Sequence, residues 1–137
     1  MSLFNVLDIA GSGMSAQALR LNTTASNLAN AESASSSSGE TYRARQPVFS
    51  AMIKALGESP AGTGVQVQGI VESQAPLRQQ YEPGHPMAND EGYIFLPNVS
   101  MVEEMANMIS ASRSYQSNSE VAKTSKQLLM RTLSLGE

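Results

Sequence analysis

The stretch PNVSMVEEMANMISASRSYQSNSEVAKTSKQLLMRTLSL, residues Pro97–Leu135, predicts one long helix near the C-terminus. Pro97 and Asn98 are typical of a loop, and Ser100 with Glu103 has the S-x-x-E form of a helix-capping box. No Gly or Pro follows until the penultimate residue, so nothing interrupts the helix once it has begun. At about 1.5 Å per residue it would be roughly 50 Å long. A helix of that length needs a partner of similar length.

Side chains at a spacing of seven predict a stripe along one face of this helix. One row is Met101, Met108, Tyr115, Ala122 and Leu129, and the row four residues further on is Met105, Ser112, Ser119, Lys126 and Leu133. The middle of the helix is rich in Ser, which forms helices poorly in isolation because its hydroxyl competes for backbone hydrogen bonds. We interpret it as a helix that becomes ordered in an assembly; an ordinary Ser-rich solvent face is the alternative.

A second long helix is predicted over Leu3–Asn30. Two rows have the interleaved seven-residue spacing of a coiled-coil seam, and they are Leu7, Met14, Leu21 and Leu28, with Phe4, Gly11, Ala18 and Ala25. In the second row every residue after Phe4 has a small side chain or none, which would let the backbone of a neighbouring helix come close. The sequence Gly11-Ser12-Gly13 predicts a weak point or kink, because a Gly in a helix interior costs about 1 kcal/mol relative to Ala.

The middle of the chain predicts a loop and short strands. The Ser-rich run Ser33–Gly39 is typical of a flexible loop. Residues Val65–Val71 alternate as a strand does, Leu77–Tyr81 is a further strand candidate, and Val48–Leu56 could be strand or helix. Pro and Gly residues make 59–64 a turn cluster and 82–92 a loop of turns.

These elements predict a mainly α fold. Long N- and C-terminal helices would form a coiled-coil-like pair, with a small β-rich insert between them. The expected division is residues 1–31, N-terminal helix; 32–41, Ser-rich loop; 42–97, small β-rich insert and turn loop; and 98–137, C-terminal helix.

The composition excludes several classes of protein. Aromatic residues make up only 5% of the 137 residues, and there is no Trp. We therefore do not expect a large hydrophobic core within a single subunit. The net charge of −3 argues against nucleic-acid binding, which favours a basic face. No apolar run is long enough to embed in a membrane. The N-terminus lacks the basic region of a secretory signal, so export would need a route without a cleaved signal.

The polar residues predict no catalytic centre, metal or cofactor. His85 is the only histidine, and it stands between Gly84 and Pro86, where a turn residue is the more common role than a metal ligand beside Glu82. Zero cysteines exclude disulfides and thiolate sites. A serine nucleophile would need a histidine base, and no elbow motif surrounds any Ser. We therefore expect a protein that is not an enzyme.

Motifs at both ends carry a resemblance to a known family. The first is ASNLANA at residues 25–31, after Ser12-Gly13-Met14 and Arg20-Leu21-Asn22. The second is the series of short runs YEPGHP at 81–86, DEGY at 90–93, PNV at 97–99 and ASRSYQSN at 111–118. The chain resembles the flagellar basal-body rod family, in particular its proximal-rod subunits, over essentially its whole length.

This resemblance implies a structural subunit of the proximal rod, the helical drive shaft that transmits torque across the periplasm and surrounds the export channel. The implied partners are other copies of the chain, other rod subunits, a membrane-ring adaptor and the flagellar type III export apparatus. The expected assembly interface comprises Leu7, Met14, Ala18, Leu21, Ala25, Asn27, Leu28, Asn30, Met101, Met105, Met108, Ala111, Ser112, Tyr115, Asn118, Ala122, Leu129 and Leu133.

Two other functions remain open from the sequence. A coiled-coil adaptor unrelated to the rod would share the seven-residue spacing but has no reason to carry ASNLANA or PNV. A different axial subunit of the rod or hook would share the terminal motifs, and the region Glu82–Val99 would discriminate it.

Overall fold

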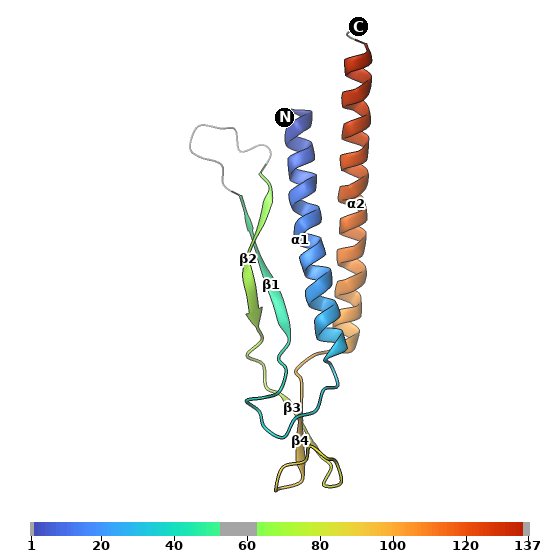
Figure 1. Cartoon of the computed structure of the whole chain (residues 1–137). Coiled ribbons are helices and arrows are strands. Elements are labelled where there is room, and N and C mark those ends of the chain that lie inside the picture. The colour runs from blue at the N-terminus through green and yellow to red at the C-terminus, as the bar shows by residue number, and fades with distance from the viewer. Residues whose placement is uncertain (1, 53–62, 136–137) are drawn as a thin grey trace.

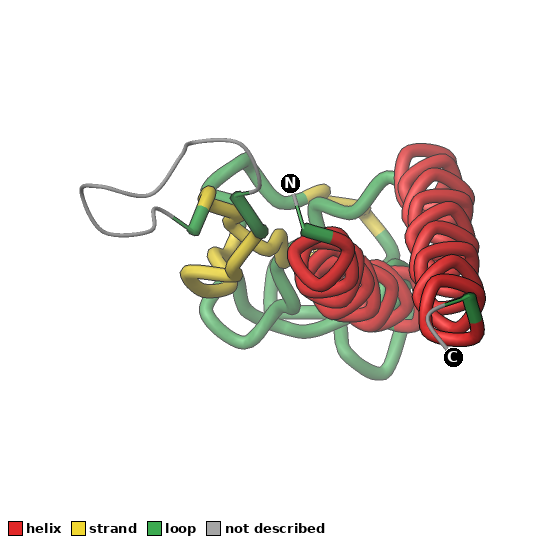
Figure 2. Tube along the Cα trace, turned by 90° about the horizontal axis from the view of Figure 1, so that it is seen from above, coloured by secondary structure: helices red, strands yellow, loops and turns green. Residues whose placement is uncertain are grey.

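The computed structural model describes residues 2–52 and 63–135. In chain order the elements are α1 (Leu3–Ala29), β1 (Arg45–Ala51), β2 (Val65–Glu72), β3 (Arg78–Tyr81), β4 (Tyr93–Leu96) and α2 (Met101–Ser134). The molecule is elongated, with α1 and α2 side by side and antiparallel and with β3 and β4 at the end where the helices are connected (Figure 1). Seen from above, α1 lies between the β1–β2 hairpin and α2 (Figure 2).

Both predicted helices are confirmed. Helix α1 begins after Ser2, whose hydroxyl accepts a hydrogen bond from the backbone N–H of Phe4 at 3.2 Å. Helix α2 begins after Ser100, whose hydroxyl accepts from the N–H of Glu103 at 3.4 Å, as the capping motif predicted. Glu103 and Glu104 lie in the first turn of α2, where the positive end of the helix dipole favours carboxylates.

The Gly-Ser-Gly sequence does not interrupt α1; it permits close packing on two sides. A Cβ atom at Gly13 would lie 2.7 Å from Asn118 Nδ2 of α2, so the helices approach closely there. Ser12 accepts a hydrogen bond from the N–H of Val65 at 3.1 Å, and a Cβ atom at Gly64 would lie 2.8 Å from its hydroxyl oxygen. Ser12 and Gly13 therefore let α1 contact the hairpin and α2 at the same level, whereas a Cβ atom at Gly11 would have no neighbour within 4 Å.

Strands β1 and β2 form an antiparallel hairpin along α1. The strand predicted at Val65–Val71 is confirmed. The described part of Val48–Leu56 is strand up to Ala51, and residues 53–56 lie outside the described chain, as do residues 59–62 of the predicted turn cluster. Gln68 is an extra residue in β2 opposite the step from Val48 to Phe49, so the hairpin carries a β-bulge.

Strands β3 and β4 form a second, separate antiparallel pair at the connected end of the helices. Tyr81 pairs with Tyr93 in register, and their rings make an edge-to-face contact with centroids 5.2 Å apart. Gly92 has φ +81°, which L side chains rarely adopt, and a Cβ atom there would lie 2.9 Å from the Tyr81 ring. The loop between the strands thus needs Gly at this position.

The predicted fold class is wrong. The helices hold 27 and 34 residues, less than half of the chain, and two antiparallel sheets make the fold a mixture of helix and sheet. The helices lie side by side, but with the two sheets beside them the arrangement is not clearly a long paired-helix coiled coil. Helix α1 packs against α2 and also against a hairpin with strands of 7 and 8 residues. The sequence predicted this hairpin only as part of a small β-rich insert.

The small hydrophobic cluster lies where the helix ends meet the sheets. Ala31, Ala44 and Val99 are buried there, with Tyr42 packed against them. Such short side chains bury little apolar area, in line with the low aromatic content. Polar contacts therefore carry much of the junction between elements.

Candidate assembly surfaces

The face of α2 that contacts α1 is small and polar. Its fully buried members are Glu104, Ala111 and Ser125, and the flanking residues Asn107 and Asn118 are half-buried. Arg20 Nη2 of α1 donates to Asn107 Oδ1 at 2.8 Å. Small side chains allow the two backbones to come close, so this contact depends on shape and hydrogen bonds more than on apolar area.

Most of the larger apolar side chains of α2 are exposed, and Met108 and Leu129 are half-buried. We define the apolar patch of α2 as Met101, Val102, Met105 and Ile109, which lie one and two turns apart on one face at the start of the helix. Met105 is 54% exposed and Ile109 is 55% exposed. A contiguous apolar patch on an elongated subunit is typical of a surface that another protein covers.

The residues of the predicted interface fall into three groups. Ala25, Met101, Met105, Tyr115 and Leu133 are exposed. Those that are half-buried are Leu7, Met14, Ala18, Leu21, Leu28, Asn30, Met108, Ser112, Asn118, Ala122 and Leu129. Asn27 and Ala111 are buried within the subunit.

Asn27 joins α1 to the start of β1. Its side-chain N–H donates to the Arg45 carbonyl at 2.8 Å, while its Oδ1 accepts from the Arg45 N–H at 2.9 Å and from the Tyr42 hydroxyl at 2.8 Å. Asn27 is only 1% exposed. The amide therefore mimics a neighbouring strand and fixes the angle between helix and hairpin.

Asn98 and Arg78 complete the same junction from the C-terminal side. Asn98 Oδ1 accepts from the Ala44 N–H at 2.8 Å, and its Nδ2 donates to the Ala75 carbonyl at 2.9 Å. Arg78 donates to the carbonyls of Ala31 and Pro97 at 3.0 and 3.2 Å. The sequence marked PNV as a motif but did not reveal these roles, because they depend on contacts between residues far apart in the chain.

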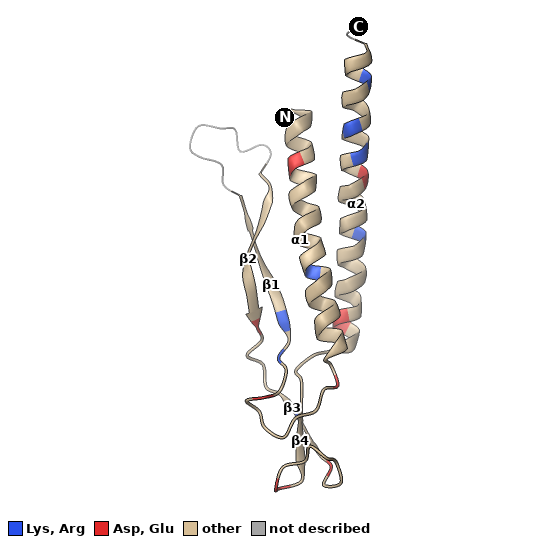
Figure 3. Ribbon diagram, in the orientation of Figure 1, with Lys and Arg blue, Asp and Glu red and all other residues tan. Residues whose placement is uncertain are grey.

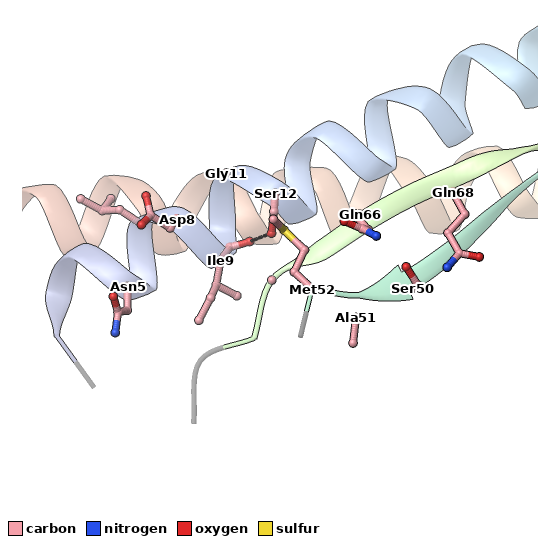
Figure 4. Close-up of a pocket in the computed structure, with 12 residues that line it drawn as sticks. Asn5, Asp8, Ile9, Gly11, Ser12, Ser50, Ala51, Met52, Gln66 and Gln68 are labelled. Carbon is pink, nitrogen blue, oxygen red and sulfur yellow. Dashed lines mark hydrogen bonds between the residues drawn. The ribbon is translucent and has the colours of Figure 1, made fainter. Parts of the chain in front are cut away.

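A hollow of about 770 Å³ lies between the start of α1 and the end of the hairpin where β1 stops and β2 begins (Figure 4). Ile9, Ser50 and Met52 line it, and the Ser12 hydroxyl beside it donates to the Ile9 carbonyl at 2.8 Å. Asp8 is the one titratable side chain among the described residues that line it. Those described residues therefore include no pair of groups that could act as acid and base.

His85 has a local role in a turn. Its Nδ1 accepts a hydrogen bond from the Met87 N–H at 3.1 Å. Within residues 2–52 and 63–135, no three His, Asp or Glu side chains are placed to hold a metal ion. In the same ranges no helix combines the length and apolar character that crossing a membrane requires.

Comparison with known proteins identifies the family. Residues 7–32 match the family described as "Flagella basal body rod protein", and residues 90–135 match "Flagellar basal body rod FlgEFG protein C-terminal". Flagellar basal-body rod proteins FlgC of Escherichia coli O6:H1 and of Salmonella typhimurium are each 50% identical over 137 residues, with the whole of both chains covered. The FlgC protein of Borreliella burgdorferi is 34% identical over 149 residues, covering 98% of each chain.

The chain belongs to the FlgC family of flagellar basal-body rod proteins. It is a structural protein of the basal-body rod, so the function and location that the sequence predicted are confirmed. The two segments that match rod families meet at the junction described above. Asn27 from the first segment binds Arg45, and Asn98 from the second binds the adjacent Ala44. Both family-matching segments therefore contribute a side chain to the junction that holds the helices and the hairpin together.

Proposed function

We propose that this FlgC-family chain is a subunit of the proximal rod and that its copies join a helical drive shaft around the export channel. The shaft transmits torque through many staggered contacts between elongated subunits. The names of the relatives support a structural role and not a catalytic one. The proposed partners are other rod subunits, a membrane-ring adaptor and, during delivery, the flagellar type III export apparatus.

The observation that carries this proposal is the apolar patch of α2. The isolated subunit buries only three of the 34 residues of α2, and all three are small or polar. An isolated helix this long gains too little from such a contact to offset the cost of ordering it, about 1–2 kcal/mol per residue. Covering the patch with neighbouring subunits would supply the missing burial, at about 25 cal/mol per Å² of apolar surface.

An in-frame deletion tests the proposed function. We expect electron microscopy of basal bodies from the deletion strain to show membrane rings without rod, hook or filament, and the intact gene to restore all three. Normal filaments and swimming in the deletion strain would contradict the proposal.

Met105→Glu is expected to abolish swimming while leaving the subunit folded. Met105 is exposed in the subunit, so a charge there costs little in the monomer but would be buried without a partner in an assembly. Soft-agar swimming and far-UV circular dichroism of the purified chain measure the two effects. Met105→Leu is the matched control, since it keeps an apolar side chain of similar volume and should swim normally. If the Glu variant swims like the Leu variant, Met105 is not in the interface.

A further inference from the structure

Helix α2 extends beyond α1 at the end far from β3 and β4 (Figure 1). Two contacts fix the antiparallel register, because Arg20 meets Asn107 and Gly13 meets Asn118. Continued at the same rise, this register brings Leu3, the first residue of α1, close to Leu128 of α2. We call residues 129–135, which follow that level, the α2 overhang.

The α2 overhang combines exposed apolar side chains with basic ones. Met130 is 62% exposed, Leu133 is 69% exposed and Leu135 is 85% exposed. Arg131 lies in the overhang, and Lys126 is exposed little more than one turn before it. An apolar surface with a positively charged rim has the composition of a protein-binding site for an acidic partner.

The opposite end of the same molecule has the complementary composition. Residues 79–112 contain five Asp or Glu and no Lys or Arg. Asp90 and Glu91 are exposed in the β3–β4 loop, beside the exposed rings of Tyr81 and Tyr93. We call this surface the acidic end. Figure 3 shows that basic residues outnumber acidic ones along the upper part of α2, where Glu120 is the acidic residue, and that acidic residues lie in the β3–β4 loop and at the base of α2.

The helix dipole explains only part of this separation. It favours Glu103 and Glu104 in the first turn of α2 and Arg131 in the last turn. The effect falls off within one turn, so it accounts neither for Lys126 nor for Asp90 and Glu91, which are outside any helix. The charges at the two ends therefore need a further reason.

We propose that the α2 overhang of one subunit docks on the acidic end of a second copy of this chain. The two surfaces lie at opposite ends of an elongated molecule, so the contact is head-to-tail and can repeat along an axis. Apolar side chains would pack at its centre, and Lys126 and Arg131 would face Asp90 and Glu91 at its rim. The inference rests on the proposed rod function, and it names one of the contacts by which that assembly would grow.

A charge exchange between the two ends tests the contact in cells. In the deletion strain, Lys126→Glu with Arg131→Glu is expected to abolish swimming, because two acidic surfaces would then meet. Asp90→Lys with Glu91→Lys is expected to abolish it too, since two basic surfaces would meet. The chain with all four substitutions is expected to swim again, because its ends are complementary once more. Immunoblots should show equal amounts of all chains.

Arg113→Glu is the control, since it makes the same change at an exposed position of α2 that lies more than three turns before Lys126, and it should leave swimming unchanged. Swimming by either two-substitution variant, or failure of the four-substitution chain to swim, overturns the contact between copies. If the α2 overhang binds a different rod subunit, the four-substitution chain will fail to swim, so that case also overturns the contact between copies. A deletion strain that swims normally would instead overturn the proposed function, so the two failures are distinguishable.

Discussion

Ala111→Glu is expected to separate the two helices and to lower the free energy of unfolding by about 4 kcal/mol. Ala111 is 0% exposed and lies on the face of α2 that packs against α1. Because Ala111 has no exposed surface, the larger Glu side chain cannot fit there without moving one helix. Its carboxylate would also lose water. Urea unfolding followed by far-UV circular dichroism measures the change.

Ala106→Glu is the matched control for this prediction. It places the same side chain on the same helix at an exposed position and should change the stability by no more than about 0.5 kcal/mol. Equal stability of the two variants would mean that α2 does not pack on α1 through Ala111 in solution.

The existence and limits of both helices could be predicted from the sequence. Capping at Ser100 and the absence of Gly and Pro beyond it are local signals, and α2 begins and ends within a residue or two of the expected positions. The strand at Val65 was equally clear, because alternation is also a local signal. Each of these predictions needed no knowledge of what the element packs against.

The face that each helix buries could not be predicted in the same way. A seven-residue spacing of large apolar residues normally indicates the buried seam. In α2 the row beginning at Met101 is only partly covered, because Met101 and Tyr115 are exposed while Met108, Ala122 and Leu129 are half-buried. The buried residues of the helix are Glu104, Ala111 and Ser125 instead. The spacing identifies an apolar face but not whether the same chain or another covers it. The predicted fold class was wrong because the two antiparallel sheets, one of which packs on α1, make the fold a mixture of helix and sheet.

The ASNLANA motif shows a second limit. The sequence placed Asn27 in an expected assembly interface, and the structure surrounds it with its own chain, bound to Tyr42 and Arg45. No pattern near Asn27 indicates partners that lie 15 and 18 residues away. A buried polar residue in a motif therefore has to be tested first for its role within the subunit.

Asn27→Ala is expected to lower the free energy of unfolding by about 3 kcal/mol, since each buried polar group left without a partner costs about 1–3 kcal/mol. The substitution removes hydrogen bonds to the backbone N–H and carbonyl of Arg45 and to the Tyr42 hydroxyl. The hairpin would then lose its fixed angle to α1, so swimming should fail as well. Urea unfolding gives the stability, and soft agar gives the function.

Two comparisons separate the role of this junction from a general effect of truncation. Asn22→Ala removes the same amide from an exposed position of α1 and should change the stability by no more than about 0.5 kcal/mol. Tyr42→Phe removes the hydrogen bond to Asn27 and a longer one, 3.3 Å, with the Ser26 hydroxyl. It should cost about 1 kcal/mol alone and less when Asn27 is already Ala, because only the Ser26 bond is then left to lose. Fully additive effects of the two substitutions would show that the Tyr42–Asn27 bond does not hold the hairpin on α1.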